Sequence, residues 1–179
     1  MKKQVIEKIK KIKMLAMDVD GVLTGGEIIY INDTDEIKIW NVKDRMGFAI
    51  AHRAPEIKLA WITGRESSEV ARCAQECQID ALYQKATMKI DAYNELKEKF
   101  SLADEQIAYI GDDLIDIPIL RLAGLAVSPA DAPGEVKKET DLVTKAAGGK
   151  GVFRELVELV LKTQGSWDRA CERYYEKGE

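Results

Sequence analysis

The sequence predicts an α/β fold with a three-layer, doubly wound, mainly parallel sheet. Two observations lead to this class. From Ile12 onward, short apolar segments rich in β-forming residues alternate with segments of helical periodicity, as expected for repeated strand–helix units. Glycines and polar residues follow several of the apolar segments, where the chain must turn from a strand into a helix. We therefore expect one domain over residues 1–179, with helices on both faces of the sheet.

The apolar segments give the predicted strands, and the periodic segments between them give the helices. The strands are Met14–Met17, Ile57–Ile62, Ala81–Tyr83, Ile107–Ile110 and Leu125–Val127, with Leu142–Thr144 at the edge. The helices are Asp44–Arg53, Ser67–Cys77, Lys89–Phe100, Ile115–Ala123 and Gly151–Lys162. Pro118 falls near the first turn of its helix, where proline is tolerated.

One insertion interrupts this alternation. Glu27–Ile31 and Glu36–Trp40 are strand-like segments on either side of Asn32–Asp35, so residues 27–40 are predicted to form a β-hairpin that projects from the sheet. The last stretch, residues 165–179, is charged and carries three aromatic residues. Either a helical tail or a frayed end is consistent with it.

Charge and composition exclude several classes of protein. Lys and Arg number 27 and Asp and Glu 31, and the resulting net charge of −4 argues against a nucleic-acid partner. No run approaches the roughly 18 apolar residues of a membrane span. The basic amino terminus lacks the apolar run and cleavage site of a secretory signal, so we expect a cytoplasmic protein without a membrane partner.

The amino terminus and the cysteines are predicted to be structural. Apolar residues recur at helical spacing among the lysines of residues 1–13, which favours a short docking helix over a membrane-surface helix. Cys73, Cys77 and Cys171 are an odd number and form no CxxC pair. We expect reduced thiols without a catalytic role.

An acidic pair follows the first predicted strand. Asp18 and Asp20 come directly after Met14–Met17, and the period of two along a strand places them on the same side. In an open parallel sheet, ligands bind beyond the carboxyl ends of the strands, and Gly21 lets the chain turn away there. Neighbouring carboxylates repel unless a cation separates them, and Mg²⁺ is the hard cation that suits oxygen ligands. Taken alone, the segment is equally consistent with a turn capped by aspartates.

A second acidic segment repeats the arrangement. Asp112 and Asp113 follow the strand Ile107–Ile110 and Gly111, and they open a predicted helix. An aspartate at a helix start is also a common N-cap, so neither residue is decisive by itself. Two acidic strand ends together predict a metal site.

Two further strand-to-helix junctions carry groups suited to a phosphate. Thr63 and Gly64 follow the strand Ile57–Ile62, and a hydroxyl, a turn glycine and a helix N-terminus suit a phosphate oxygen. Lys89 begins a predicted helix and can supply a fixed positive charge, although most lysines taken singly are solvated surface residues. We expect all these groups at one edge of the sheet.

The order of these groups resembles the four motifs of the haloacid dehalogenase superfamily of phosphohydrolases. The matching residues are Asp18–Thr24, Thr63, Lys89 and Gly111–Asp113. The resemblance implies that Asp18 is a nucleophile that forms an aspartyl-phosphate and that Asp20 is the general acid and base. It implies Mg²⁺ ligands at the Asp18 carboxylate, the Asp20 carbonyl and Asp112, with Asp113 as an outer or alternate ligand. Thr63 and Lys89 would complete an oxyanion clamp.

The segments between these motifs leave no room for a cap domain. A hairpin and a helix fill the first segment, and a helix and a strand fill the second. The chain resembles the capless branch of this Rossmann-like superfamily, which contains the 3-deoxy-D-manno-octulosonate 8-phosphate phosphatases of lipopolysaccharide synthesis. The matching segments are Asp18–Thr24, Trp40–Asp44, Ile62–Arg65, Leu82–Gln84, Tyr109–Asp116 and Gly148–Glu155. The resemblance implies a homotetramer whose hairpin and tail contact neighbouring active sites, which would exclude water from an open site.

The same resemblance implies a sugar phosphate substrate. The implied substrate-binding residues are Asp20, Asn41, Val42, Lys43, Asp44, Gly64, Arg65, Arg72 and Lys89. The chain departs from the family's pattern at Arg45, Ala49, Cys73 and Lys85. A sugar carboxylate prefers guanidinium partners, so these departures affect the substrate and not the phosphatase chemistry. Arg65 favours the octulosonate, and a nonulosonate 9-phosphate is the alternative.

A phospho-receiver-like binding module is the competing class. Such a module also combines an aspartyl-phosphate, Mg²⁺, a threonine and a lysine on a doubly wound sheet. Its acidic pair lies on the first strand and its phosphate-accepting aspartate on a later one. Here Asp18 and Asp20 come first, and Asp112 and Asp113 come late. The order therefore favours a phosphatase over a binding switch.

Overall fold

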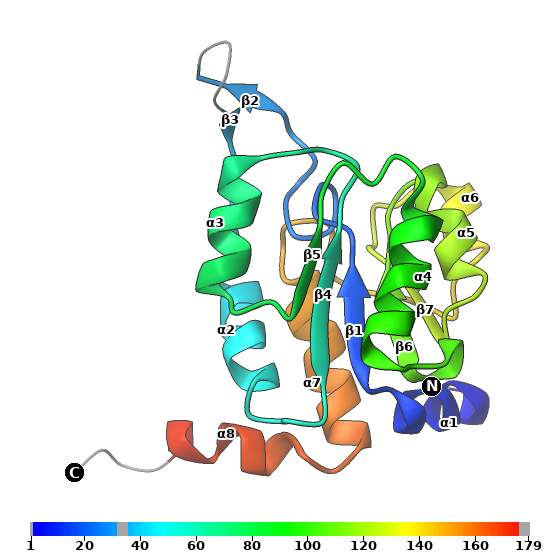
Figure 1. The fold of residues 1–179 in the computed structure, drawn as a ribbon. Coiled ribbons are helices and arrows are strands. Elements are labelled where there is room, and N and C mark those ends of the chain that lie inside the picture. The colour runs from blue at the N-terminus through cyan, green and yellow to red at the C-terminus, as the bar shows by residue number, and fades with distance from the viewer. Residues whose placement is uncertain (1, 32–35, 176–179) are drawn as a thin grey trace.

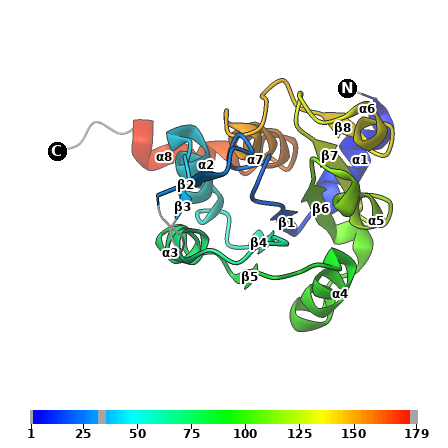
Figure 2. The same ribbon diagram turned by 90° about the horizontal axis from the view of Figure 1, so that it is seen from above.

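The sheet of the protein is parallel throughout. The computed structural model describes residues 2–31 and 36–175, and within them six strands form one sheet in the order β5-β4-β1-β6-β7-β8 (Figures 1 and 2). The strands are β1 Met14–Met17, β4 Lys58–Ile62, β5 Ala81–Tyr83, β6 Ile107–Ile110, β7 Leu125–Ser128 and β8 Leu142–Val143. All their pairings are parallel. The predicted α/β class is confirmed.

Helices cover both faces of this sheet, as the views in Figures 1 and 2 show. Their bounds are α1 Lys3–Lys11, α2 Val42–Ala51, α3 Ser68–Glu76, α4 Lys89–Phe100, α5 Ile117–Leu120, α6 Gly134–Lys137, α7 Val152–Thr163 and α8 Trp167–Tyr175. Alternate residues of β1 enter different cores, because strand side chains point alternately to the two faces. Leu15 and Met17 pack with α1, α2, α3, α7 and α8. Met14 and Ala16 pack with α4, α5 and α6.

Most predicted elements lie within two residues of the observed ones, and the differences have local causes. The helix predicted at Ile115–Ala123 is a 3₁₀ turn, Leu114–Asp116, followed by the short α5. Pro118 lies at the start of α5, where its missing N–H costs no helical hydrogen bond. The helix α2 begins two residues earlier than predicted because Asn41 is its N-cap and accepts a hydrogen bond from the Lys43 N–H (2.9 Å). The short α6 was not predicted.

The insertion forms a short antiparallel hairpin that projects above the strand ends (Figure 1). Its strands are β2 Ile29–Tyr30 and β3 Glu36–Ile37, shorter than the predicted segments, while the predicted turn at residues 32–35 lies outside the described residues. Apolar side chains of the hairpin remain exposed, with Tyr30 at 69% and Ile39 at 61%. Large apolar side chains that are exposed together on one element are typical of interaction surfaces.

The two ends of the chain are helical where they are described. The amino-terminal α1 buries Val5 and Ile9, as expected for a docking helix. The described part of the predicted tail forms α8, which buries Ala170 and Cys171, while residues 176–179 lie outside the described part. All three cysteines are free thiols. Within the described ranges, no helix is long and apolar enough to pass through a bilayer.

Candidate active site

The register of the three central strands brings the predicted groups to one edge of the sheet. Met17 pairs with Trp61 on one side and with Ile110 on the other. Asp18, which follows Met17, donates its N–H to the Ile110 carbonyl at 3.0 Å. Ends of adjacent parallel strands form the usual ligand crevice of such a sheet. The segments after β1, β4 and β6 therefore meet at this edge.

Lys89 lies between two carboxylates at this edge. Its Nζ is 2.8 Å from Asp18 Oδ2 and 2.7 Å from Asp116 Oδ1, and its side chain is fully buried. Tyr109 donates its hydroxyl to the same Asp116 oxygen at 2.7 Å. A buried ammonium is tolerated only when carboxylates and hydrogen bonds compensate for its lost hydration. Lys89 is thus a fixed charge inside the site and not a solvated lysine.

Three carboxylates gather around this charge. Oxygens of Asp18, Asp112 and Asp116 lie within 4.8 Å of one another. Burial raises the pKa of Asp18 to about 7, and the Asp116 charge adds to this rise while Lys89 opposes it. Burial, with the charges of Asp18 and Asp116, raises the pKa of Asp112 to about 8. The ionised cluster is therefore costly without a further positive charge.

The cluster fits a hard cation. Within the described chain, Asp112 Oδ1 is a buried oxygen without a hydrogen-bond donor. Gly21 has a φ of +83°, and a Cβ at this position would overlap the Asp112 carboxylate. Glycine thus leaves room for this carboxylate beside the chain that follows Asp18. Carboxylate oxygens in such a group are the ligands that divalent hard cations prefer, so these residues fit a metal site.

Asp116 is a member of the site that the sequence reasoning left without a role. Besides Lys89 and Tyr109, it accepts the backbone N–H groups of Asp112 (3.1 Å) and Asp113 (3.2 Å), and it is fully buried. Asp116 thus holds the acidic loop and the lysine together. The sequence offered one signal for this role. Asp116 lies four residues after Asp112 between the apolar residues Ile115 and Ile117, and a carboxylate that is buried among apolar residues usually has charged or hydrogen-bonding partners.

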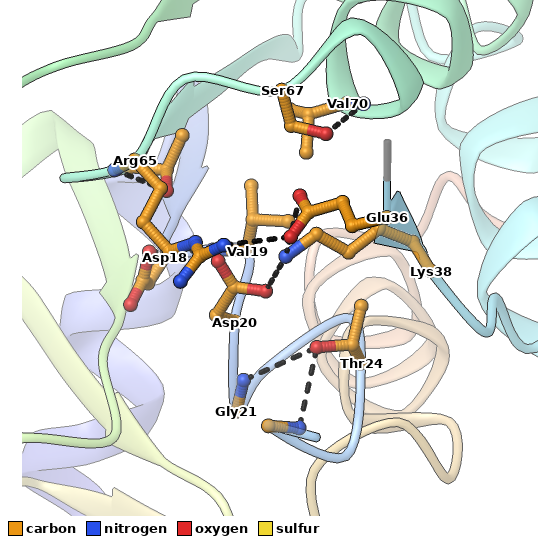
Figure 3. A network of polar contacts seen from close by, with 12 residues as sticks. Asp18, Val19, Asp20, Gly21, Thr24, Glu36, Lys38, Arg65, Ser67 and Val70 are labelled. Atoms are coloured by element: carbon orange, nitrogen blue, oxygen red, sulfur yellow. Dashed lines mark hydrogen bonds and ion pairs between the residues drawn. The ribbon is translucent and has the colours of Figure 1, made fainter. Parts of the chain in front are cut away.

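Asp113 and Asp20 lie apart from this carboxylate cluster. The exposed Asp113 accepts the Leu114 N–H at 2.7 Å and caps the 3₁₀ turn, which is the capping arrangement considered for this segment. The Asp20 carboxylate instead pairs with Lys38 of the hairpin (Figure 3). Lys38 and Glu36 were not predicted as site residues, because charged residues in a projecting hairpin are usually solvated.

Thr63 and Arg65 occupy the loop after β4. Thr63 is buried and donates its N–H to the Tyr83 carbonyl at 2.9 Å. Its Oγ1 accepts the Arg65 N–H at 3.4 Å. Arg65 extends towards the hairpin, where Nη2 donates to Glu36 Oε2 at 2.7 Å (Figure 3). Gly64 between them is only partly buried.

The residues predicted to contact the sugar are scattered over several environments. Asn41 donates to the Gly149 carbonyl at 2.9 Å, while Val42 and Lys43 are exposed at the start of α2. Asp44 is buried, and its Oδ1 accepts the Arg154 N–H at the start of α7 (2.9 Å). Burial raises the pKa of Asp44 to about 6. This carboxylate therefore holds two helices together in the described chain.

Arg72 lies on α3, and the positions that depart from the family's pattern lie on α2 (Arg45 and Ala49), on α3 (Cys73) and after β5 (Lys85). Arg72 is exposed and pairs with Glu69 and Glu76 of its own helix. Arg45 also reaches Glu76, with Nη2 at 2.9 Å from Oε2. Lys85 has a φ of +56°, a left-handed conformation that glycine adopts more readily.

Comparison with known proteins identifies the family. A model of the haloacid dehalogenase-like hydrolases matches residues 64–156. One relative is the 3-deoxy-D-manno-octulosonate 8-phosphate phosphatase of Escherichia coli (strain K12). It is 43% identical to this chain over 167 residues, which cover 93% of this chain and 88% of the relative. The chain belongs to the haloacid dehalogenase-like hydrolases.

Solved structures of other haloacid dehalogenase-like hydrolases share the whole fold. The octulosonate 8-phosphate phosphatase of Moraxella catarrhalis, in complex with magnesium, phosphate and KDO, has a TM-score of 0.91 at 37% identity, covering 96% of this chain and 98% of that one. The cobalt-bound octulosonate 8-phosphate phosphatase of Haemophilus influenzae has a TM-score of 0.86 at 35% identity, covering 90% and 94%. Divalent metals thus occur in two structural relatives.

Mg²⁺ is expected to raise the melting temperature, and to raise it more at pH 8 than at pH 6. The raised pKa values of Asp18 and Asp112 mean that the folded state binds protons that the unfolded state releases. Stability of the metal-free protein therefore falls as the pH rises from about 4 to about 8. A cation that binds the ionised carboxylates stabilises the fold by about 2.7 kcal/mol at a 100-fold excess over its Kd.

Calorimetry with saturating MgCl₂ or with EDTA, at both pH values, measures this effect. The Asp112→Asn variant should lose most of the Mg²⁺-dependent shift, because it removes one of the clustered carboxylates. Identical melting temperatures in Mg²⁺ and EDTA at pH 8 would show that the cluster holds no cation.

Asp116→Asn is expected to lower the free energy of unfolding by about 3–5 kcal/mol, because it leaves the buried Lys89 with one carboxylate fewer. Urea denaturation checks this value. The matched control is Glu7→Gln, which breaks the exposed Glu7–Lys10 pair and should change stability by less than about 1 kcal/mol. A similarly small change for Asp116→Asn would contradict the role given to Asp116.

Proposed function

We propose that this chain is a Mg²⁺-dependent phosphomonoesterase that hydrolyses 3-deoxy-D-manno-octulosonate 8-phosphate to octulosonate and phosphate. The observation that carries the proposal is the pairing of Asp18 with the buried Lys89 beside Asp112 at the strand ends. The identity with the Escherichia coli octulosonate 8-phosphate phosphatase over 93% of this chain supports the substrate.

Asp18 acts as the nucleophile in this proposal. One of its carboxylate oxygens attacks phosphorus, the bond from phosphorus to the sugar oxygen breaks, and an aspartyl-phosphate forms. Lys89 holds Asp18 Oδ2 at 2.8 Å, and the Val19 N–H donates to Oδ1 at 2.6 Å. Both contacts fix the orientation of the carboxylate before substrate binds.

Asp20 acts as general acid and base. It protonates the sugar oxygen as that oxygen leaves, and it then takes a proton from the water that hydrolyses the aspartyl-phosphate. Thr63 and Lys89 contribute a hydroxyl donor and a positive charge to the phosphoryl oxygens. The buried positions of both residues limit competing contacts with water.

The cation would be held by the Asp18 and Asp112 carboxylates and by the Asp20 carbonyl, while Asp113 caps the turn beside Asp112 in the chain. When bound, Mg²⁺ supplies charge neutralisation to the transferring phosphoryl group. Asp116 takes part indirectly, since it orients the Asp112 backbone and Lys89. The receiver-like alternative is less well supported, because no comparable role for Asp20 exists in a binding switch.

The hairpin and the tail are proposed to form contacts between subunits. Ile28, Tyr30, Ile31 and Ile39 are at least half exposed on the hairpin, and large exposed apolar side chains gathered in one element favour a protein partner. We propose that the partners are further copies of this chain in a homotetramer, with hairpin and tail reaching neighbouring sites. We also propose that the chain forms one domain and acts in the cytoplasm.

Phosphate release, measured with Mg²⁺ and with EDTA, tests the proposed activity. The substrates are octulosonate 8-phosphate, nonulosonate 9-phosphate, common hexose phosphates and p-nitrophenyl phosphate. We expect Mg²⁺-dependent preference for octulosonate 8-phosphate, and a loss of kcat of more than about 10⁴-fold in Asp18→Asn. Glu98→Gln, at an exposed position on α4, is the matched carboxylate-to-amide control and should retain activity.

Preference for nonulosonate 9-phosphate would contradict the proposed substrate but leave the proposed mechanism unchanged. It would assign the change in specificity to the departures from the family's pattern. Full activity of Asp18→Asn would show that Asp18 is not the nucleophile. Absence of turnover with every ester would support the binding-module class instead.

Substitution of exposed hairpin residues tests the proposed assembly. The double variant Ile28→Asp/Tyr30→Asp should dissociate the tetramer, because desolvating the two introduced carboxylates opposes burial of this surface. Light scattering after gel filtration measures the mass. Leu122→Asp, at an exposed position remote from the hairpin in the chain, is the control, and an unchanged mass for the hairpin variant would refute this interface.

A further inference from the structure

Lys38 of the hairpin lies in direct contact with the carboxylate of Asp20. Its Nζ donates to Asp20 Oδ1 and lies 3.4 Å from Glu36 Oε1. The side chain of Lys38 is 1% exposed, whereas that of Asp20 is 23% exposed. Figure 3 shows both side chains between the hairpin and the chain that follows β1. The hairpin thus provides a buried cation beside the proposed acid and base.

The position of Lys38 is fixed by a chain of alternating charges. Glu36, two residues earlier, contacts Lys38 and also accepts from Arg65 Nη2 at 2.7 Å. Arg65 belongs to the loop after β4, so the hairpin is tied to two strand ends at once. An exposed lysine would exchange between water and several partners, but a buried ammonium must keep its carboxylates. Lys38 therefore restrains the Asp20 side chain.

The two oxygens of Asp20 differ in their surroundings. Oδ1 accepts from Lys38, whereas Oδ2 is buried and has no hydrogen-bond partner among the described residues. We propose that Lys38 is a positioning residue for catalysis, which holds Asp20 Oδ1 so that Oδ2 is the oxygen that carries the proton. This inference rests on the proposed phosphatase function.

The proton transfers of the reaction are compatible with these separate roles of Asp20 Oδ1 and Oδ2. In the first step the bond from phosphorus to the sugar oxygen breaks, its electron pair goes to that oxygen, and the proton on Asp20 Oδ2 follows. In the second step water forms a bond to phosphorus, its proton returns to Oδ2, and the bond between phosphorus and the Asp18 oxygen breaks. Asp20 Oδ1 remains an acceptor for Lys38 in both protonation states. Positioning thus persists through the cycle.

A positioning role predicts a dependence on the leaving group. A sugar alkoxide is a strong base and must be protonated as it leaves, whereas p-nitrophenolate is a weak base and leaves without a proton. Loss of Lys38 should therefore slow phosphorylation of Asp18 by octulosonate 8-phosphate and spare phosphorylation by p-nitrophenyl phosphate. A general disturbance of the site would slow both phosphorylation steps alike.

Rapid-quench kinetics of Lys38→Met, with Mg²⁺ present, provides the test. We expect phosphoenzyme formation from octulosonate 8-phosphate to slow by about 100-fold. The burst of p-nitrophenolate should keep its rate within about threefold, followed by slow hydrolysis of the phosphoenzyme, which again needs Asp20. Lys10→Met removes a lysine from an exposed ion pair far from the site and should leave every step unchanged.

A double-mutant cycle tests whether Lys38 acts through Asp20. In the Asp20→Asn background, Lys38→Met should cause little further loss with octulosonate 8-phosphate, because residues that act as one unit are not additive. Equal slowing of both substrates by Lys38→Met, or a full additional loss in the Asp20→Asn background, would overturn the inference.

Two controls keep the result interpretable. Far-ultraviolet circular dichroism and a thermal melt verify folding; if Lys38→Met is unfolded, the charge-balanced variant Glu36→Gln/Lys38→Met takes its place, with the same expected outcomes. The wild-type protein is measured first with both substrates. Inactivity of the wild type would refute the proposed function itself, whereas an active wild type with equally affected substrates in the variant would refute only the role of Lys38.

Discussion

The burial of one ammonium group constrains the whole site. Lys89 lies at the start of α4, and its two carboxylate partners come from the end of β1 and from the 3₁₀ turn after β6. A buried charge that lost either partner would be strongly destabilising. The three elements must therefore keep their relative positions, and the orientation of Asp18 follows from the same contacts. Stability and the proposed chemistry depend here on one set of interactions.

The surplus of negative charge at this edge makes the site suited to a cation. When ionised, Asp18, Asp112 and Asp116 carry three negative charges, against the single positive charge of Lys89. A divalent cation compensates for the difference, and the absence of a side chain at Gly21 leaves room for the carboxylate of Asp112. The same residues that make the metal-free cluster costly thus make metal binding favourable.

The hairpin contributes to this edge in two ways. Its charged residues Glu36 and Lys38 lie against the loops after β1 and β4, where they are bound by Asp20 and Arg65. Its apolar residues, Tyr30 among them, remain exposed in the isolated chain. In the proposed function, an element that binds the proposed acid and base and presents its apolar surface to neighbouring copies couples assembly to catalysis without a separate cap domain. The relatives are named for a small sugar phosphate. A small substrate covers little of an open site, so another element must exclude water from it.

The sequence by itself determined the fold class and placed Asp18, Thr63, Lys89 and Asp112 at strand-to-helix junctions, because strand period and such junctions are local properties. The order of the strands in the sheet came only from the tertiary structure. The sequence did not determine the role of Asp116 or of Lys38, since each depends on a partner distant in the chain. It also did not separate Asp112, which joins the cluster, from Asp113, which caps a turn. Adjacent aspartates have the same chemistry, and only the path of the backbone after β6 decides which carboxylate faces the cation site.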